Sequence, residues 1–131
     1  MDSQAEISTC RVWIAIVDSD RSLDEISQLT GLTPTRSIEK GAPTKSGSKF
    51  SVRRWEMLVP VANDEPLISH MTALVDLLSQ EARVALQRLA DAAIVRIEIE
   101  IAGGTGILLP HRVLKIVSEC GADIDIDVLE A

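Results

Sequence analysis

The chain has 131 residues and a net charge of −7, with 46% apolar and 25% charged residues. This balance is typical of a folded globular protein and excludes a disordered chain. A chain of this length buries enough apolar surface to fold without a disulfide or a metal, so we expect one domain over residues 1–131. The negative charge disfavours nucleic acid and anionic membranes as partners.

Three features of the sequence indicate a cytoplasmic protein. The first residues are acidic and polar, unlike a signal peptide. No apolar run approaches the roughly 20 residues that span a bilayer. Cys10 and Cys120 are the only cysteines, too few for a secreted disulfide scaffold. We expect both to be reduced, half-buried thiols, unless the fold brings the two cysteines close enough to form a disulfide.

Aromatic residues are scarce, since Trp13, Phe50 and Trp55 are the only ones in the sequence. The core must therefore be filled by aliphatic side chains. The scarcity also disfavours a platform on which nucleic-acid bases stack.

The first part of the chain predicts a strand followed by a short helix. Residues 10–18 are rich in β-branched residues and apolar on both faces, as in a central strand. Ser22 and Glu25 have the spacing of a capping box, in which each side chain accepts a hydrogen bond from the other residue's amide. Gly31 is a typical helix stop, so we expect the helix to end there.

Two further strands joined by a long loop predict a hairpin. Residues 35–40 and 50–59 have the character of strands, and the polar loop 41–48 joins them. A turn follows, in which either Asn63 or Asp64 is available to cap the next helix.

The middle of the chain predicts two helices and a strand. Apolar residues recur with helical spacing over residues 65–92. Ser79 is placed to cap a second helix, so we expect a break there and not one long rod. Residues 93–102 then alternate as a half-buried strand, with Val95 facing inward and Arg96 outward.

Beyond this strand, a Gly-rich bend at residues 103–106 precedes a short extended stretch at 107–109 and a helix with Pro110 in its first position. Residues 123–129 alternate as a last strand. The order β-α-β-β-α(α)-β-α-β begins with the split βαββαβ arrangement of a ferredoxin-like sandwich. We therefore expect an α+β fold with a mainly antiparallel sheet, helices on one face, and an appended C-terminal helix and strand.

Several short motifs along the chain carry a family resemblance. They are the run Gly31-Leu32-Thr33-Pro34-Thr35-Arg36, the pair Lys40-Gly41, Trp55, the paired helix that begins near Leu67, and the final strand, bend, helix and acidic strand. Together they resemble the bacterial family called domain of unknown function 4279. The resemblance implies an α+β fold and no established activity, so it transfers no catalytic residue. Ala42 stands where many such sequences have an acidic residue.

No pattern in the sequence indicates catalysis. The loop from Gly41 to Lys49 superficially resembles a phosphate-binding loop, but its glycine spacing is wrong and a strand follows it. His70 and His111 belong to no metal or catalytic pattern, and we expect both to be exposed on helices. We predict no catalytic residue, metal or cofactor, and favour a non-catalytic protein without excluding an enzyme.

Acidic residues alternate on the last two predicted strands. If these strands are neighbours, five carboxylates share one surface of the sheet: Glu98, Glu100, Asp123, Asp125 and Asp127. Such a surface could hold a hard cation. Alternating acidic residues more often mark the wet side of a half-buried sheet, and this second interpretation is favoured.

Basic residues concentrate in the predicted hairpin. The segment 36–54 has six basic residues and one acid, so it carries +5 and leaves −12 on the rest of the chain. The hairpin is suited to contact an anionic partner surface or to pair with the acidic face of its own sheet. The candidate binding residues are Arg36, Lys40, Lys45, Lys49, Arg53, Arg54 and Trp55.

Three functions follow as hypotheses. The first and favoured is a non-catalytic interaction module, regulatory or immunity-type, whose basic hairpin contacts an acidic protein surface. The second is a small-molecule binder, or an enzyme, that holds an anionic ligand in a pocket beside the hairpin. The third is a homo-oligomer in which an exposed apolar helix face forms the interface.

Overall fold

The computed structural model describes residues 9–103 and 107–129. Within these residues the helices and strands follow the order expected from the sequence. They are β1 (Thr9–Val17), α1 (Leu23–Thr30), β2 (Arg36–Ile38), β3 (Arg54–Leu58), α2 (Leu67–Leu77), α3 (Gln80–Leu89), β4 (Ile94–Ala102), α4 (His111–Glu119) and β5 (Asp123–Leu129).

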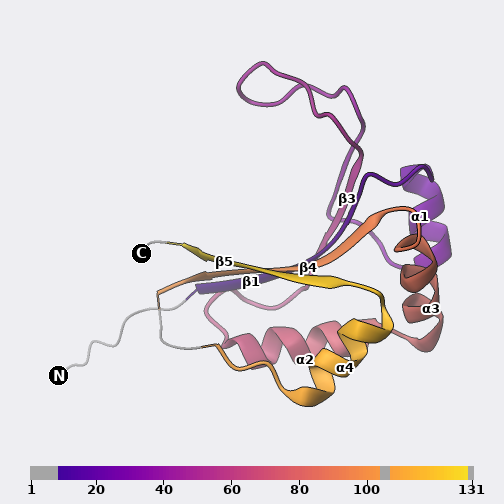
Figure 1. Cartoon of the computed structure of the whole chain (residues 1–131). Coiled ribbons are helices and arrows are strands. Elements are labelled where there is room, and N and C mark those ends of the chain that lie inside the picture. Colours follow the sequence, from indigo (N-terminus) through magenta and orange to yellow (C-terminus); the bar gives the residue numbers. More distant parts are fainter. Residues whose placement is uncertain (1–8, 104–106, 130–131) are drawn as a thin grey trace.

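The strands of the described residues form a five-stranded sheet in the order β2-β3-β1-β4-β5. Neighbouring strands are antiparallel except β4 and β5, which are parallel and are joined by the crossover through α4. The helices lie on one face of this sheet, α2 and α4 beneath its middle and α1 and α3 toward one end (Figure 1). The fold is α+β with a mixed sheet, and the last strand forms one of its edges.

The central strand β1 carries the middle of the hydrophobic core. Ile14 of β1 and Ile97 of β4 are register partners, and both are fully buried. Leu74 of α2 and Leu86 of α3 belong to the same buried cluster. The core is therefore largely aliphatic, as the composition predicts, and it fills the space between the sheet and the helices.

Helix α1 begins and ends as its sequence predicts. The Ser22 side chain accepts a hydrogen bond from the Glu25 amide, and the Glu25 side chain accepts one from the Ser22 amide. Gly31 follows the helix with a φ of 70°, a left-handed conformation that glycine adopts at low cost. The capping box is confirmed.

The break between α2 and α3 is also confirmed, but the start of α2 differs from the prediction. Ser79 caps α3 by accepting a hydrogen bond from the Ala82 amide. Pro66 precedes α2, with no side-chain cap, so the expectation that either Asn63 or Asp64 caps this helix was wrong. Asn63 instead meets the sheet, because its carbonyl oxygen accepts a hydrogen bond from the Cys10 amide at 2.8 Å.

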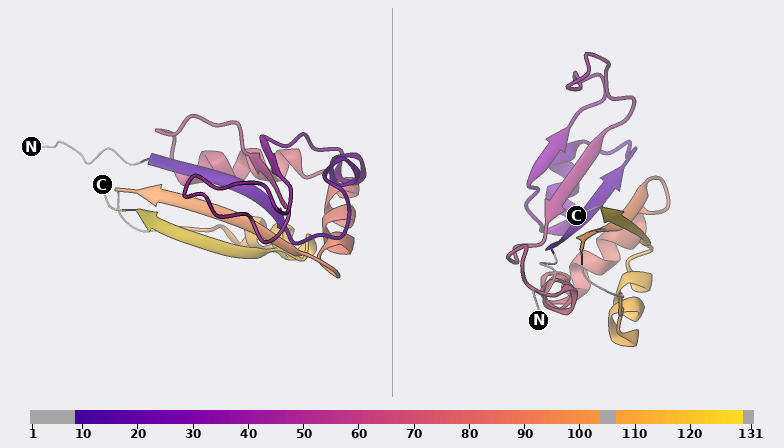
Figure 2. Two further views of the ribbon diagram at one scale, coloured as in Figure 1. Left: turned by 90° about the horizontal axis from the view of Figure 1, so that it is seen from above. Right: turned by 90° about the vertical axis from the view of Figure 1, so that its left-hand side faces the viewer.

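The hairpin strands β2 and β3 are shorter than predicted, and the residues between them project from the body of the molecule. We call residues 39–53 the arm (Figures 1 and 2). The bridge between Pro43 and Lys49 joins its two sides, and Gly41 and Gly47 take positive φ values of 90° and 89° at its bends. Backbone hydrogen bonds of 2.8 Å continue across the arm, from the Gly41 amide to Phe50, from the Phe50 amide to Ala42 and from the Thr44 amide to Ser48, although the regular ladder of β2 and β3 ends near the base.

One of the two histidines is buried, whereas the sequence led us to expect both to be exposed. His70 is fully buried on α2, where its Nε2 atom is 3.2 Å from the carbonyl oxygen of Glu65. Its Nδ1 atom has no hydrogen-bond partner among the described residues. Because α2 buries His70 together with Met71 and Leu74, its buried stripe is broader than the apolar pattern alone indicates. His111 is exposed, as predicted.

Both cysteines are buried, and neither forms a disulfide within the described part of the chain. Burial raises the pKa of the Cys10 thiol and raises the pKa of Cys120 to about 11. The extended stretch predicted at 107–109 is not a strand, and three residues of the predicted Gly-rich bend, 104–106, lie outside the described residues. No helix in the described ranges is long and apolar enough to cross a membrane.

Candidate functional site

The sheet face opposite the helices is covered by charged side chains, and we call it the open face. It receives alternate residues of every long strand, because successive side chains of a strand point to opposite faces. The strand registers place these residues side by side. They are Arg11, Trp13, Arg36, Arg54, Glu56, Arg96, Glu98, Glu100, Asp123, Asp125 and Asp127.

Glu56 of β3 is the centre of an ion-pair network on the open face. Only 4% of its surface is exposed. Arg36 Nε donates to the Glu56 Oε1 atom at 2.8 Å, and Arg36 Nη2 lies 2.7 Å from the same oxygen. Arg54 donates to the other carboxylate oxygen from Nε at 2.8 Å. Two of the seven candidate binding residues are thus held by an acid of their own sheet.

Arg54 extends this network to β4. Its Nη2 atom donates to both carboxylate oxygens of Glu98, at 2.7 and 2.8 Å. Burial alone would lower the pKa of Arg54, but the hydrogen bonds to Glu98 and Glu56 outweigh it and raise that pKa above its ordinary value. Arg54 is therefore a charged cross-link between strands on either side of β1.

A second cluster lies further along the open face. Glu100 accepts a hydrogen bond from Trp13 Nε1 at 2.9 Å, and Arg11 Nε is 3.2 Å from the same carboxylate oxygen. A hollow of about 650 Å³ lies between the two clusters, lined by Arg11, Trp13, Thr35, Arg36, Arg54, Glu56, Glu98, Glu100 and Asp127. Its three arginines face four carboxylates, so the hollow is not an anion-binding pocket.

The five alternating carboxylates do come together on the open face. Glu98 is the register partner of Asp125, and Glu100 is that of Asp127. Arginines engage both glutamates, as described above, which leaves the aspartates of β5 as the acidic edge of the face. No group of three or more metal-ligating side chains is arranged to hold a metal among the residues searched, which are those the structure describes.

Arg53 lies at the base of the arm and contacts a different part of the molecule. Its Nε atom donates to Glu39 at 2.7 Å, across the arm. Its Nη1 atom donates to the carbonyl oxygens of Asp20 and Arg21, at 3.3 and 3.0 Å. The Asp18 amide donates to the Arg53 carbonyl oxygen at 2.9 Å. Arg53 therefore fastens the loop before α1 to the arm.

Trp55 is the candidate that the fold removes from the surface. Its ring is fully buried in the core, and its Nε1 atom donates to the Ser27 hydroxyl of α1 at 3.1 Å. No face of the ring is left for a partner. The prediction that Trp55 contacts a partner is therefore wrong, because Trp55 is a core residue.

The arm carries the three remaining candidates, Lys40, Lys45 and Lys49. All three are exposed, and none forms an ion pair with another residue in the described part of the chain. Between Lys40 and Arg53 the arm contains no acidic residue. The basic hairpin thus divides into arginines neutralised at its base and lysines that project without counter-ions from the described part of the chain.

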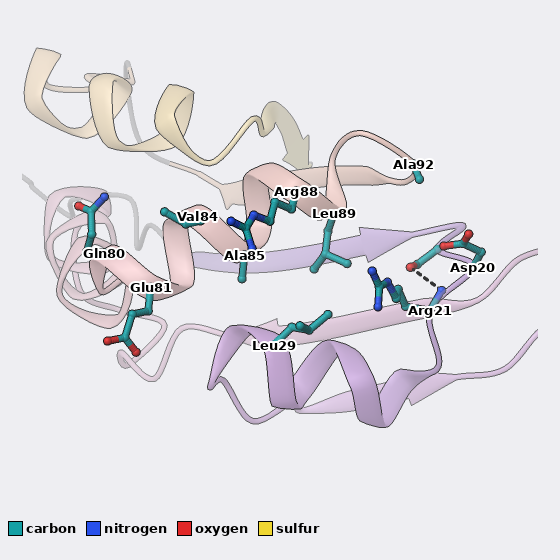
Figure 3. Close-up of a pocket in the computed structure, with 11 residues that line it drawn as sticks. Asp20, Arg21, Leu29, Gln80, Glu81, Val84, Ala85, Arg88, Leu89 and Ala92 are labelled. Carbon is teal, nitrogen blue, oxygen red and sulfur yellow. Dashed lines mark hydrogen bonds between the residues drawn. The ribbon is translucent and has the colours of Figure 1, made fainter.

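The structure also contains a concave site that sequence reasoning missed. A groove of about 500 Å³ runs between α1 and α3, and Figure 3 shows the side chains along it. It is lined by Ser19, Asp20, Arg21, Leu29, Gln80, Glu81, Val84, Ala85, Arg88, Leu89 and Ala92. The only signal in the sequence was that Leu29 and Val84 are apolar residues in short helical segments. The structure leaves these two side chains 47% and 36% exposed.

Comparisons with known proteins give a family and no activity. No curated protein and no solved structure matches the chain. One family model matches residues 8–130, nearly the whole sequence. The family resemblance seen in the short motifs is therefore confirmed, and the chain belongs to the family described as Domain of unknown function (DUF4279).

Proposed function

We propose that this protein is a non-catalytic, cytoplasmic interaction module whose arm contacts an acidic protein surface. The observation that carries the proposal is the set of three arm lysines, exposed and without ion pairs to the described residues. Charges that project on an arm are available to a partner without breaking internal contacts. Such an arm also steers an oppositely charged partner during encounter.

The charge balance supports a macromolecular partner over an anionic small molecule at the hairpin. A pocket for an anion would need Arg36 and Arg54 to present unpaired donors. Both are instead neutralised by Glu56, and Arg54 also by Glu98. The chain's net charge of −7 disfavours nucleic acid and anionic membranes.

We further propose that the first four strands and the helices between them form a ferredoxin-like sandwich. The strand order β2-β3-β1-β4, with each pair antiparallel, supports it. Fold alone selects no function, because such domains carry out many unrelated tasks.

The test is affinity capture from the native cytosol with two charge-reversed variants. Lys45→Glu with Lys49→Glu removes the arm's positive charge, and Arg112→Glu with Lys115→Glu makes the same charge change on the exposed side of α4. A charge reversal at Arg53 and Arg54 is unsuitable, because both arginines hold the fold together. A captured protein is then purified and its affinity is measured by calorimetry at several salt concentrations.

We expect a stoichiometric partner bound by the wild type and by the α4 variant but lost from the arm variant. Its affinity should fall as salt rises, because the contact is between exposed charges. Equal binding by both variants, or an affinity that salt leaves unchanged, would show that the arm is not the contact surface.

A further inference from the structure

The groove between α1 and α3 has an apolar floor. Leu29 of α1 faces Val84, Ala85 and Leu89 of α3 across it (Figure 3). Its volume of about 500 Å³ lies within the range of small-molecule sites, roughly 300–1,000 Å³, which are mostly apolar with a few polar groups. Leu29 and Val84 are 47% and 36% exposed in this concavity, so a ligand that covers them would gain the free energy of burying their apolar surface.

Two arginines stand over this floor. Arg21 extends from its loop toward Leu29 and Leu89, and Arg88 lies along α3 (Figure 3). Arg88 has no ion pair or hydrogen bond from its side chain to any residue that the structure describes. Arg21 has an exposed contact of 3.4 Å with Glu25, at the long end of hydrogen-bond distance.

Among the described residues, neither acidic side chain of the groove, Asp20 or Glu81, forms an ion pair with Arg21 or Arg88. Glu81 and Gln80 are at the opposite end from Arg21 (Figure 3). Asp20 is beside Arg21 in sequence, but its side chain is drawn turned outward from the floor (Figure 3). The two guanidinium groups lie at separate points along the groove, that of Arg21 at the end near Leu29 and Leu89 and that of Arg88 over the middle of α3, near Ala85 (Figure 3).

The loop that carries Arg21 forms one wall of the groove, and several contacts hold it in place. Asp18 adopts a φ of 63°, which is uncommon for a residue other than glycine. Buried Ser19 accepts a hydrogen bond from the Arg21 amide at 3.1 Å, and Arg53 donates to the Arg21 carbonyl oxygen at 3.0 Å. A wall held in this way places Arg21 in advance of binding, which lowers the entropic cost of holding a ligand.

We propose that this groove binds a small amphipathic carboxylate, with its apolar body on Leu29 and Val84 and its carboxylate at Arg88, while Arg21 adds positive charge at the end of the groove. Guanidinium groups form strong, directional hydrogen bonds with carboxylates, and the apolar floor contributes in proportion to the area it loses to water. The site is distinct from the proposed arm contact, since it shares no side chain with the arm lysines.

The probe is octanoate, compared with 1-octanol and octylamine, which have the same chain and a neutral or cationic end. Binding is followed by the thermal midpoint of unfolding and by amide chemical shifts in solution. We expect octanoate to raise the midpoint more than either analogue and to shift the amides of residues 19–30 and 80–92. Anionic selectivity is the result that distinguishes this site from a merely apolar cleft.

Three variants locate the site. Val84→Glu places a charge on the exposed floor and should abolish octanoate binding without unfolding the chain, because Val84 is not in the core. Arg88→Ala should weaken octanoate about tenfold and leave 1-octanol unchanged. Arg112→Ala, an exposed arginine on α4, should change neither.

Equal effects of octanoate and 1-octanol would overturn the carboxylate assignment, and octanoate binding unaffected by Val84→Glu would overturn the groove. The arm variant Lys45→Glu with Lys49→Glu must still bind octanoate, and Val84→Glu must still capture any arm partner. Either proposal can therefore fail while the other stands.

Discussion

Glu56 is the least exposed acid of the open face, and two of the ion pairs there depend on it. We expect Glu56→Gln to destabilise the fold by about 3 kcal/mol, because it removes one of the two carboxylates that pair with Arg54 and the carboxylate to which both contacts of Arg36 are made. The free energy of unfolding from denaturant titration measures this. Glu119→Gln breaks the exposed pair with Arg83 and should cost less than about 1 kcal/mol. Equal losses of stability in the two variants would mean that the ion pairs of Glu56 stabilise the fold no more than an exposed pair does.

The Cys120 thiol gives the molecule a weakness at alkaline pH. Burial, the larger effect, and nearby Glu119 outweigh Arg83 and raise the pKa of Cys120 from 9.0 to about 11. Between these values the unfolded chain releases the proton and the folded chain keeps it. The stabilisation is thus complete below pH 9 and is lost as the pH rises toward 11, by at most about 1.4 kcal/mol per pH unit.

This prediction is tested by the free energy of unfolding of wild type and Cys120→Ala between pH 8 and 11. We expect the variant to lose less stability over that interval, whatever the alanine costs at pH 8. Parallel curves would show that Cys120 does not contribute to the alkaline loss.

Single residues also show where sequence reasoning stops. The clustering of six basic residues in segment 36–54 was visible, but their partners depended on strand register, which composition does not encode. Once β3 lies beside β1 and β1 beside β4, Arg54 reaches Glu98, 44 residues away. The burial of His70 was likewise invisible, because only the packing of α2 shows how wide its buried stripe is.

At the scale of elements, the capping box sets the start of α1 and one wall of the groove. We expect Ser22→Ala to cost about 1 kcal/mol, measured by denaturant titration, with Ser37→Ala on exposed β2 as the control. A cost no larger than that of the control would show that the cap is redundant.

The same box should make α1 sensitive to acid. The hydrogen bond from the Ser22 amide lowers the pKa of Glu25 below its ordinary value. The stabilisation is therefore present above the unfolded pKa of Glu25 and is lost as the pH falls through the lowered value.

The tip of the arm, residues 43–49, lies beyond the contacts that Arg53 makes with the body of the molecule. Replacing residues 43–49 with Asn-Gly, which favours a two-residue hairpin turn, removes Lys45 and Lys49 and the bridge between Pro43 and Lys49. No side chain in 43–49 belongs to the buried core cluster. We expect the thermal midpoint to stay within about 4 °C of wild type while partner capture is lost. A much larger fall would show that the arm stabilises the body.

Most elements were predictable because each carries its own local signal. The cap at Ser22, the stop at Gly31 and the break at Ser79 depend on residues a few positions apart. The ends of β2 and β3 were not predictable, because the sequence on either side of the arm suits a strand even beyond Ile38 and Arg54, where the regular ladder ends. The groove was missed for a related reason, since it exists only where α1 and α3 lie side by side without closing on each other.

At the scale of the whole molecule, the exposed edge strand β5 decides whether copies associate. No other strand of the described chain pairs with its outer edge, and Val128 is largely exposed there. Such an edge invites pairing with a second copy, but the aspartates of β5 would then face each other. We expect a monomer at micromolar concentration, and about tenfold tighter self-association for Asp125→Asn with Asp127→Asn.

Sedimentation equilibrium measures this association. Asp76→Asn with Asp91→Asn makes the same charge change at exposed positions away from the sheet edge and should leave the chain monomeric. Association of both variants to the same extent would assign the effect to net charge and not to the edge.

Arg53 joins the arm to the loop that precedes α1. One guanidinium group holds Glu39 of the arm and the backbone of the loop that walls the groove. A protein that draws the arm away from this loop would change the affinity of the groove for a carboxylate. Thermodynamic reciprocity then requires the carboxylate to change the affinity for that protein by the same factor. Through Arg53, the domain would relay the concentration of a small molecule to a protein partner.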